Sequence, residues 1–175
     1  RMTALDAQSG GKSVLKTTIG YNDPSSTTAT GQVKTWKSGA TTYTYAYDAR
    51  GNITSVSDGQ STTTYAYDSF DQLVRENNQA AGKTWTYAYD DGGKRITKTV
   101  NGTAYNYHYL GDQLVELTWG GNKLHFTYDS TGPLSVNCNG TEYFYVKNAQ
   151  GDVTGLVSAS GTRVVTYTYD AWGNP

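Results

Sequence analysis

The sequence has little cysteine, no long apolar run and no excess of charge of either sign, and each shortage excludes a class of protein. Only one cysteine, Cys138, occurs among the 175 residues. A single cysteine can form neither a disulfide within the chain nor a zinc site made of thiolates. A disulfide framework and a zinc-finger-type site are therefore excluded.

Apolar residues never continue for the roughly 18 positions that a membrane-spanning helix needs. No basic stretch followed by an apolar one marks a signal peptide. The net charge is -1, and Lys and Arg are scattered singly among Asp and Glu. Without a basic face, the chain cannot gain affinity for a phosphate backbone by releasing counterions. We therefore expect no membrane span and no nucleic-acid partner.

Tyrosine and glycine are the residues that the sequence has in abundance. There are 16 Tyr and 20 Gly, against 3 Pro, 3 Phe and 1 Met. Tyr is frequent in strands and Gly in turns, so this composition predicts strands and turns rather than helices. A chain of this length is enough for one domain with a core of its own.

A short phrase that ends in Tyr-Asp returns along the chain at steps of 19 to 22 residues. Its aspartate place is occupied by Asp48, Asp68, Asp90, Leu110, Asp129, Asn148 and Asp170. Self-similarity at a fixed short period is typical of a small supersecondary unit stacked many times. We predict six to seven repeats of about 20 residues over residues 41–175, and residues 1–40 as a degenerate first unit. We expect a single structural domain that is part of a longer chain.

Aromatic residues alternate with small ones before each aspartate place. Tyr43, Tyr45 and Tyr47 fall on one face of an extended chain, with threonine or alanine between them. A period of two predicts a strand with an aromatic face. A tyrosine ring can pack on its cross-strand neighbours while the hydroxyl still reaches water or a turn amide. The rows are therefore expected to stack along a sheet.

A short turn and then an aliphatic residue follow each aspartate place. The turn glycines are Gly51, Gly92, Gly111, Gly132, Gly151 and Gly173. The aliphatic residues are Ile53, Leu73, Ile96, Leu114, Leu134 and Val153. This spacing predicts a second strand registered against the first. We expect the Asp side chain to accept backbone N–H groups that close the turn, and the glycines to provide positive φ.

The return to the next repeat carries residue pairs suited to tight hairpins. They are Asp58-Gly59, Asn101-Gly102, Gly120-Gly121 and Asn139-Gly140. Type I′ turns need φ > 0 at both central residues, which such pairs tolerate. The fold class predicted is all-β: an antiparallel meander of roughly a dozen short strands in one twisted, curved sheet with almost no helix.

No catalytic, cofactor or metal site is predicted. His108 and His125 have no further histidine or carboxylate spaced to join them, so we expect partly exposed strand residues. The aspartates recur once per repeat, whereas a catalytic carboxylate pair is needed only once. Turn closure therefore explains them better than hydrolysis or calcium binding. The glycines precede no helical pattern that would make a phosphate cradle.

The phrases YDARGN and YDAWGN, with weaker copies between them, closely resemble the YD repeats of Rhs proteins, teneurins and the shell components of insecticidal toxin complexes. The resemblance covers residues 41–175, and the last stretch is similar to the run that leads into the Rhs-associated core. It implies a sheet that spirals into a hollow shell around a C-terminal toxic cargo. The aspartate-dependent self-cleavage site of that core has no counterpart before Pro175.

The resemblance implies a non-catalytic scaffold in a secreted or cell-surface bacterial protein, with the other repeats and a C-terminal cargo domain as partners. The residues expected to carry the repeat structure are Tyr47, Asp48, Gly51, Tyr67, Asp68, Tyr89, Asp90, Tyr109, Tyr128, Asp129, Gly132, Asn148, Gly151, Tyr169, Asp170 and Gly173. Free sheet edges also predict edge-to-edge self-association of the fragment.

The alternative interpretation is a binding module for cell-surface carbohydrate. Exposed aromatic rings can stack on sugars, and Trp119 and Trp172 lie near predicted turns, where a ring can stay accessible. Aromatic stripes at strand period more often pack against one another. Packing is therefore the first expectation, and sugar binding at Trp119 and Trp172 the second.

Overall fold

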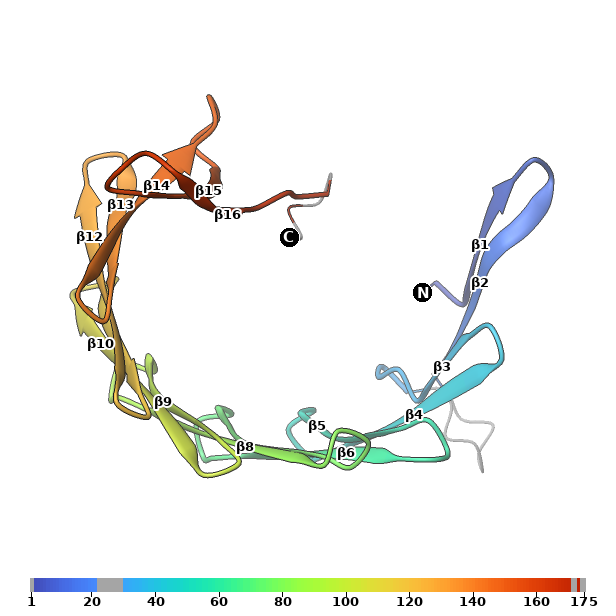
Figure 1. Ribbon diagram of the computed structural model, residues 1–175. Helices are drawn as coiled ribbons and strands as arrows, with labels where there is room; N and C mark the ends of the chain where they lie inside the picture. Colours follow the sequence, from blue (N-terminus) through green and yellow to red (C-terminus); the bar gives the residue numbers. More distant parts are fainter. Residues whose placement is uncertain (1, 22–29, 171–172, 174–175) are drawn as a thin grey trace. The chain divides into compact units, whose positions relative to one another are not determined.

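Strands are the only regular elements in this computed structural model, which describes residues 2–21, 30–170 and 173 (Figure 1). That part of the chain has sixteen strands and no helix. The strand order in the sheet is the sequence order, from β1 to β16, and the ladders are antiparallel. The predicted all-β antiparallel meander is confirmed. The chain divides into two compact units, Arg1–Ala88 and Tyr89–Pro175.

The first unit is a series of antiparallel hairpins. Its strands are β1 (Ala4–Ser9), β2 (Lys12–Gly20), β3 (Thr35–Ser38), β4 (Thr41–Tyr47), β5 (Ile53–Ser57), β6 (Thr62–Tyr67), β7 (Leu73–Asn78) and β8 (Lys83–Tyr89). Strands β1 to β3 come from the segment expected to be a degenerate repeat, and they raise the strand count above the predicted dozen. These strands form although the segment has no Tyr-Asp phrase, because pairing with a neighbouring strand holds an extended segment in the sheet. Trp36 of β3, for example, pairs with Tyr43 of β4.

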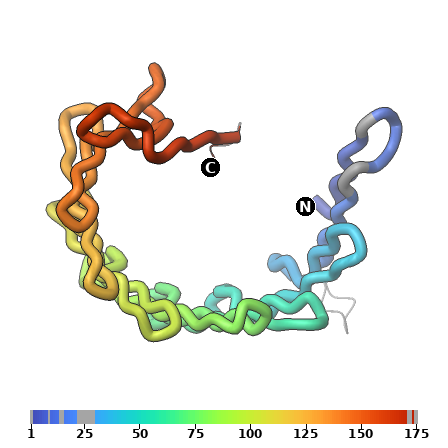
Figure 2. Tube along the Cα trace, viewed as in Figure 1, coloured from blue at the N-terminus to red at the C-terminus, as the bar shows by residue number. Residues whose placement is uncertain are grey.

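The second unit continues the same construction. Its strands are β9 (Arg95–Val100), β10 (Thr103–Leu110), β11 (Gln113–Trp119), β12 (Asn122–Asp129), β13 (Gly132–Cys138), β14 (Thr141–Lys147), β15 (Val153–Ser158) and β16 (Arg163–Thr166). Figure 2 follows the backbone back and forth through these hairpins, and Figure 1 shows the strands of this unit turning progressively from β9 to β16.

Three of the four predicted tight hairpins are present in the second unit. Asn101 and Gly102 have φ values of 46° and 88°, Gly120 and Gly121 of 49° and 83°, and Asn139 and Gly140 of 49° and 94°. Each pair lies between two residues that are partners in the ladder, for example Val100 and Thr103. Positive φ at both central residues is the type I′ signature.

The prediction for Asp58-Gly59 is wrong. Ser57 pairs with Thr62, so four residues separate the strands instead of two. The Asp58 carboxylate accepts the N–H groups of Gln60 at 2.9 Å and Ser61 at 2.8 Å, and thereby stabilises a wider loop. An aspartate that can bond to the backbone ahead of it competes with the tight turn that the same residue pair otherwise favours.

Burial is shallow because strands pack only against their sequence neighbours in each unit. Among the described residues, only Thr17, Ser135, Val136 and Gly155 are buried, and no side chain is fully enclosed. Within a strand, exposure alternates, as in β12, where Leu124, Phe126 and Tyr128 are half-buried and the residues between them are exposed. The sheet therefore has an aromatic face that its own neighbours cover only in part.

Candidate functional site

The aspartate of a repeat begins a five-residue turn that its own side chain closes. Oδ1 of Asp48 accepts the backbone N–H groups of Arg50 and Asn52, both at 2.9 Å. The N–H of Asp48 donates to the carbonyl of Asn52 at 2.9 Å, which ends the turn. A carboxylate oxygen that accepts two backbone N–H groups satisfies donors that a tight bend would otherwise leave unpaired.

The same contacts recur at other repeats. Asp68 accepts from Phe70 at 2.8 Å and Gln72 at 3.0 Å. Asp90 accepts from Gly92 and Lys94, both at 2.9 Å. The predicted aspartates thus lie at corresponding places in successive turns, and their carboxylates are engaged with the backbone next to them.

A carboxamide or a hydroxyl can take the place of the carboxylate. Oδ1 of Asn148 accepts from Gln150 at 3.0 Å and from Asp152 at 2.9 Å. The hydroxyl of Ser158 accepts from Thr162 at 3.2 Å in a turn that the repeat pattern did not identify. The turn therefore requires an acceptor oxygen and does not require a negative charge.

The third residue after the aspartate has a positive φ. The value is 97° at Gly51, 92° at Gly151 and 82° at Gly173. In the Asp90 turn this residue is Gly93, at 81°, and the sequence interpretation that assigned the role to Gly92 is wrong. The N–H of Gly93 donates to the carbonyl of Asp90 at 3.0 Å, so the fourth turn position, not the third, takes the left-handed conformation that glycine tolerates.

Two predicted turns differ from this pattern. Asp129 accepts the N–H and the hydroxyl of Thr131, both at 2.7 Å, in a tighter turn in which Asp129 pairs with Gly132. Leu110, in the aspartate place of another copy, pairs with Gln113 across a two-residue turn and is 73% exposed. Gly111 has a φ of 59° in that turn, so the backbone bends without a side-chain acceptor.

In several copies of the repeat, the tyrosine that precedes the aspartate place ties its strand to an earlier part of the chain. The hydroxyl of Tyr47 donates to the carbonyl of Val33 at 2.6 Å. The other ties join Tyr109 to Arg95 at 3.1 Å, Tyr128 to Leu114 at 2.8 Å and Tyr169 to Val153 at 2.7 Å. The acceptor carbonyl lies 14 residues earlier in the sequence in three cases and 16 in the fourth. Because phenylalanine has no hydroxyl, replacing any of these tyrosines by phenylalanine removes the bond.

Basic side chains connect neighbouring turns along the rim of each unit. In the first unit, Arg50 Nη1 donates to Oδ1 of Asp71 at 2.8 Å and to the carbonyl of Ser69 at 3.0 Å. In the second, Lys94 Nζ lies 2.6 Å from Oδ1 of Asp112, in the next turn along. These pairs are exposed, and each adds little to stability on its own.

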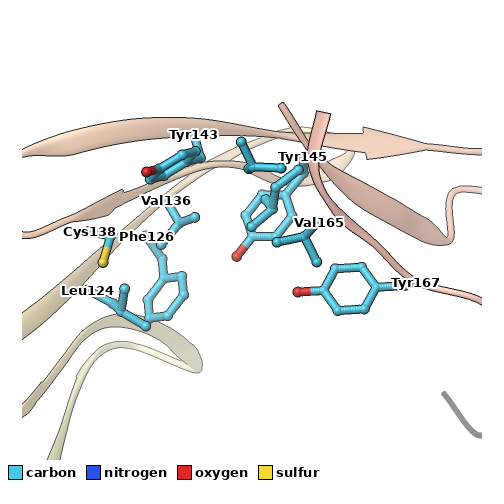
Figure 3. Close-up of a pocket in the computed structure, with 10 residues that line it drawn as sticks. Leu124, Phe126, Val136, Cys138, Tyr143, Tyr145, Val165 and Tyr167 are labelled. Atoms are coloured by element: carbon cyan, nitrogen blue, oxygen red, sulfur yellow. The ribbon is translucent and has the colours of Figure 1, made fainter. Parts of the chain in front are cut away.

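An apolar hollow lies on the aromatic face of the second unit. It has a volume of about 480 Å³, and β12 to β16 provide its lining. Figure 3 shows rings of Phe126 from β12, Tyr145 from β14 and Tyr167 from the segment after β16 projecting toward it. Sequence reasoning missed this hollow, because its members lie one or two to a strand and come together only through the register.

A smaller groove of about 360 Å³ lies beside the Gly120-Gly121 turn. Asn106, Asn122 and Lys123 line it, together with Trp119. The Trp119 ring is stacked on Tyr105, with centroids 5.9 Å apart and planes inclined by 16°. One face of the indole is therefore used in packing. Trp172, the other predicted sugar-stacking residue, is outside the described residues.

The recurring turn and the meander together correspond to a known family. The sequence matches the family model described as teneurin YD-shell over residues 3–174. This chain belongs to the teneurin YD-shell family. The resemblance to YD-repeat proteins is thereby confirmed, and it extends to the segment before residue 41, where the phrase itself is weak.

Two Bacillus proteins are similar to part of this YD-shell chain. The tRNA3(Ser)-specific nuclease WapA of Bacillus spizizenii is 49% identical over 92 residues. The tRNA nuclease WapA of Bacillus subtilis strain 168 is 42% identical over 92 residues. In each case the match covers 50% of this chain and 4% of the relative's length. Their nuclease names describe whole proteins of which this segment matches a small part.

Solved toxin-complex structures share the fold. The Tc holotoxin pore of Photorhabdus luminescens superimposes with a TM-score of 0.56 at 15% identity, over 94% of this chain and 10% of that chain. The TcdB2-TccC3 crystal structure gives a TM-score of 0.55 at 15% identity, over 91% of this chain and 10% of that chain. The YD-shell chain therefore shares the fold of the matching parts of those structures.

The electrostatics of the YD-shell turns oppose acid catalysis. The Asn52 side chain and backbone N–H groups stabilise the ionised form of Asp48 and hold the pKa of its carboxyl below the ordinary value. Thr131 lowers the pKa of Asp129 in the same way. A general acid needs a raised pKa. Within the described part of the chain, no three His, Cys, Asp or Glu side chains are grouped to hold a metal ion.

The histidines lie on the face opposite the aromatic rows. His108 pairs with Glu116 across one strand, and Glu116 pairs with His125 across the next. Both imidazoles are exposed. The part of the chain that the structure describes contains no helix long and apolar enough to cross a membrane.

Acid should selectively weaken the Asp48 turn. Because the folded-state pKa of Asp48 lies below its unfolded value, its contribution to stability is complete above the unfolded pKa of about 3.9 and is lost as pH falls through the folded pKa. Asp48→Asn keeps an acceptor oxygen but cannot titrate. We expect wild type to unfold at a higher urea concentration than Asp48→Asn at neutral pH. The difference between the two unfolding midpoints in urea should disappear toward about pH 2. A difference that stays constant with pH would contradict this prediction.

Removing one tyrosine tie should cost stability without disturbing the ring packing. Tyr128→Phe loses the bond to the Leu114 carbonyl, and we expect the free energy of unfolding to fall by about 1 kcal/mol in a urea titration. Tyr107→Phe is the matched control, because the Tyr107 hydroxyl makes no hydrogen bond within the described residues and its ring contacts Arg95. Equal losses in the two variants would show that the tie is energetically irrelevant.

Proposed function

We propose that this chain is a length of non-catalytic wall in a longer YD-repeat protein of a secreted or cell-surface bacterial type. In that protein the wall encloses or presents a C-terminal toxin cargo. The observation that carries the proposal is the repeated use of the aspartates. At Asp48, Asp68 and Asp90 the carboxylate is engaged with its own turn backbone. A catalytic carboxylate would instead be directed at a substrate.

The partners follow from the same arrangement. Tyrosine ties and rim pairs join a hairpin to the hairpin before it, so the first partner of any repeat is its neighbour. The toxin-complex shells with this fold support a cargo as the second partner. No cofactor is part of the proposal. Edge-to-edge association of the isolated chain remains a prediction, for which sedimentation at high concentration is the measurement.

The wall proposal predicts that turn acceptors, not charges, protect the cargo. In the full-length protein, replacing Asp48, Asp68 and Asp90 together by Ala should loosen three turns and make the downstream segment sensitive to protease. The same triple replacement by Asn keeps three acceptor oxygens and should leave the segment protected, as Asn148 indicates. Equal protease resistance of the downstream segment in the Ala triple variant and the Asn triple variant would contradict the proposal. Cleavage of tRNA by the purified chain alone would also contradict it, because it would make this segment an enzyme.

A carbohydrate-binding role is the second candidate, and the groove beside Trp119 favours it. Two carboxamides, a hydroxyl from Thr118 and the ammonium of Lys123 line that groove, and such groups hydrogen-bond sugar hydroxyls. Trp119→Ala should then abolish retention of the chain on bacterial cell-wall polysaccharide. Trp85→Ala, a change in the strand β8, is the control. Retention that survives Trp119→Ala, or no retention by wild type, would remove this candidate.

A further inference from the structure

The apolar hollow of the second unit has the dimensions of a ligand site. Its volume of about 480 Å³ lies within the range of pockets that hold small molecules in proteins. Its floor contains Val136, which is 5% exposed, and side chains of five consecutive strands surround it. The wall itself needs no such hollow, because its strands are joined by ladders, turns and tyrosine ties that lie outside it.

The lining determines the charge of a suitable ligand. Leu124, Phe126, Leu156 and Val165 provide aliphatic and aromatic surface, and no charged side chain is among the lining residues. An ion placed there would lose hydration without gaining a counterion, which is costly. A neutral molecule with a mostly apolar body loses little hydration and gains contact with this surface.

Tyr143, Tyr145 and Tyr167 line the hollow, and the phenol groups of the last two determine the polar part of the ligand. Figure 3 shows the hydroxyl ends of Tyr145 and Tyr167 directed into the hollow from β14 and from the segment after β16. Neither hydroxyl makes a hydrogen bond within the described residues, in contrast to Tyr128, whose hydroxyl is bonded to the Leu114 carbonyl. Burial, and then the nearby Tyr167 and Tyr128, raise the pKa of Tyr145, so its phenol keeps its proton at neutral pH.

Two O–H donors that face one hollow can meet on a single acceptor oxygen. A carbonyl oxygen has two lone pairs and no proton, so it can accept both bonds while the rest of the molecule stays apolar. An alcohol could donate its proton to one phenol oxygen and accept from the other, so a carbonyl oxygen is the group that uses both phenols as donors. We propose that this hollow binds a neutral, largely apolar small molecule whose carbonyl oxygen accepts hydrogen bonds from Tyr145 and Tyr167.

The test uses the 175-residue chain and two fluorescent naphthalene probes that differ by one group. The first carries a dimethylamino group and a propionyl ketone, and the second lacks the ketone. We expect saturable binding of the first probe with a blue shift, and weaker binding of the second. In the double variant Tyr145→Phe with Tyr167→Phe, affinity for the ketone should fall about fivefold or more, and affinity for the probe without the ketone should stay the same.

Two further variants distinguish binding in the hollow from non-specific binding to exposed apolar surface. Val165→Phe fills part of the hollow and should weaken binding of both probes. Phe144→Ala removes an exposed apolar ring, 39% accessible, from the other face of β14 and should change neither affinity. The proposal is overturned if Phe144→Ala weakens binding as much as Val165→Phe does. It is equally overturned if the Tyr-to-Phe double variant keeps the preference for the ketone, or if wild type binds neither probe saturably.

Discussion

The bond from a turn N–H to an aspartate oxygen is the contact on which the rest of the repeat depends. By accepting two N–H groups, Asp48 fixes a bend of five residues. The ladder shifts by one residue just before it, between Ala46 and Tyr47, so that Tyr47 comes to lie opposite Ile53. Register in turn fixes which face the aromatic rows occupy, because a slip of one residue would move every ring to the other face. In this copy of the repeat, the turn, the register and the face are therefore set together by one local interaction.

Much of this could be predicted from the sequence, because the repeat signal is local. The Tyr-Asp phrase and its period of about 20 residues predict strands, turns and an antiparallel order from contacts a few residues apart. Local signals failed where two of them competed. Asp58 caps a loop of four residues in place of the tight turn that Asp-Gly favours, and Gly93, not Gly92, takes the positive φ in a turn that contains both.

Features that depend on register across strands could not be predicted. The tyrosine ties join residues 14 or 16 positions apart. Nothing in the sequence around Tyr128 or Leu114 marks these two residues as hydrogen-bond partners. The apolar hollow needs five strands in the correct register before its lining comes together. In the segment before residue 41, the aromatic alternation is too weak to identify, although Trp36 stacks on Tyr43 at 5.2 Å and continues the aromatic face.

The interchange of Asp48, Asn148 and Ser158 in one structural role has a consequence for how such walls diverge. Each of these side chains offers the oxygen that the bend requires, but only the first carries a charge. The electrical character of the turn rim can therefore change repeat by repeat while the backbone keeps its path. A lineage can adjust the surface potential of the rim, and with it solubility and long-range attraction or repulsion, without altering the architecture beneath.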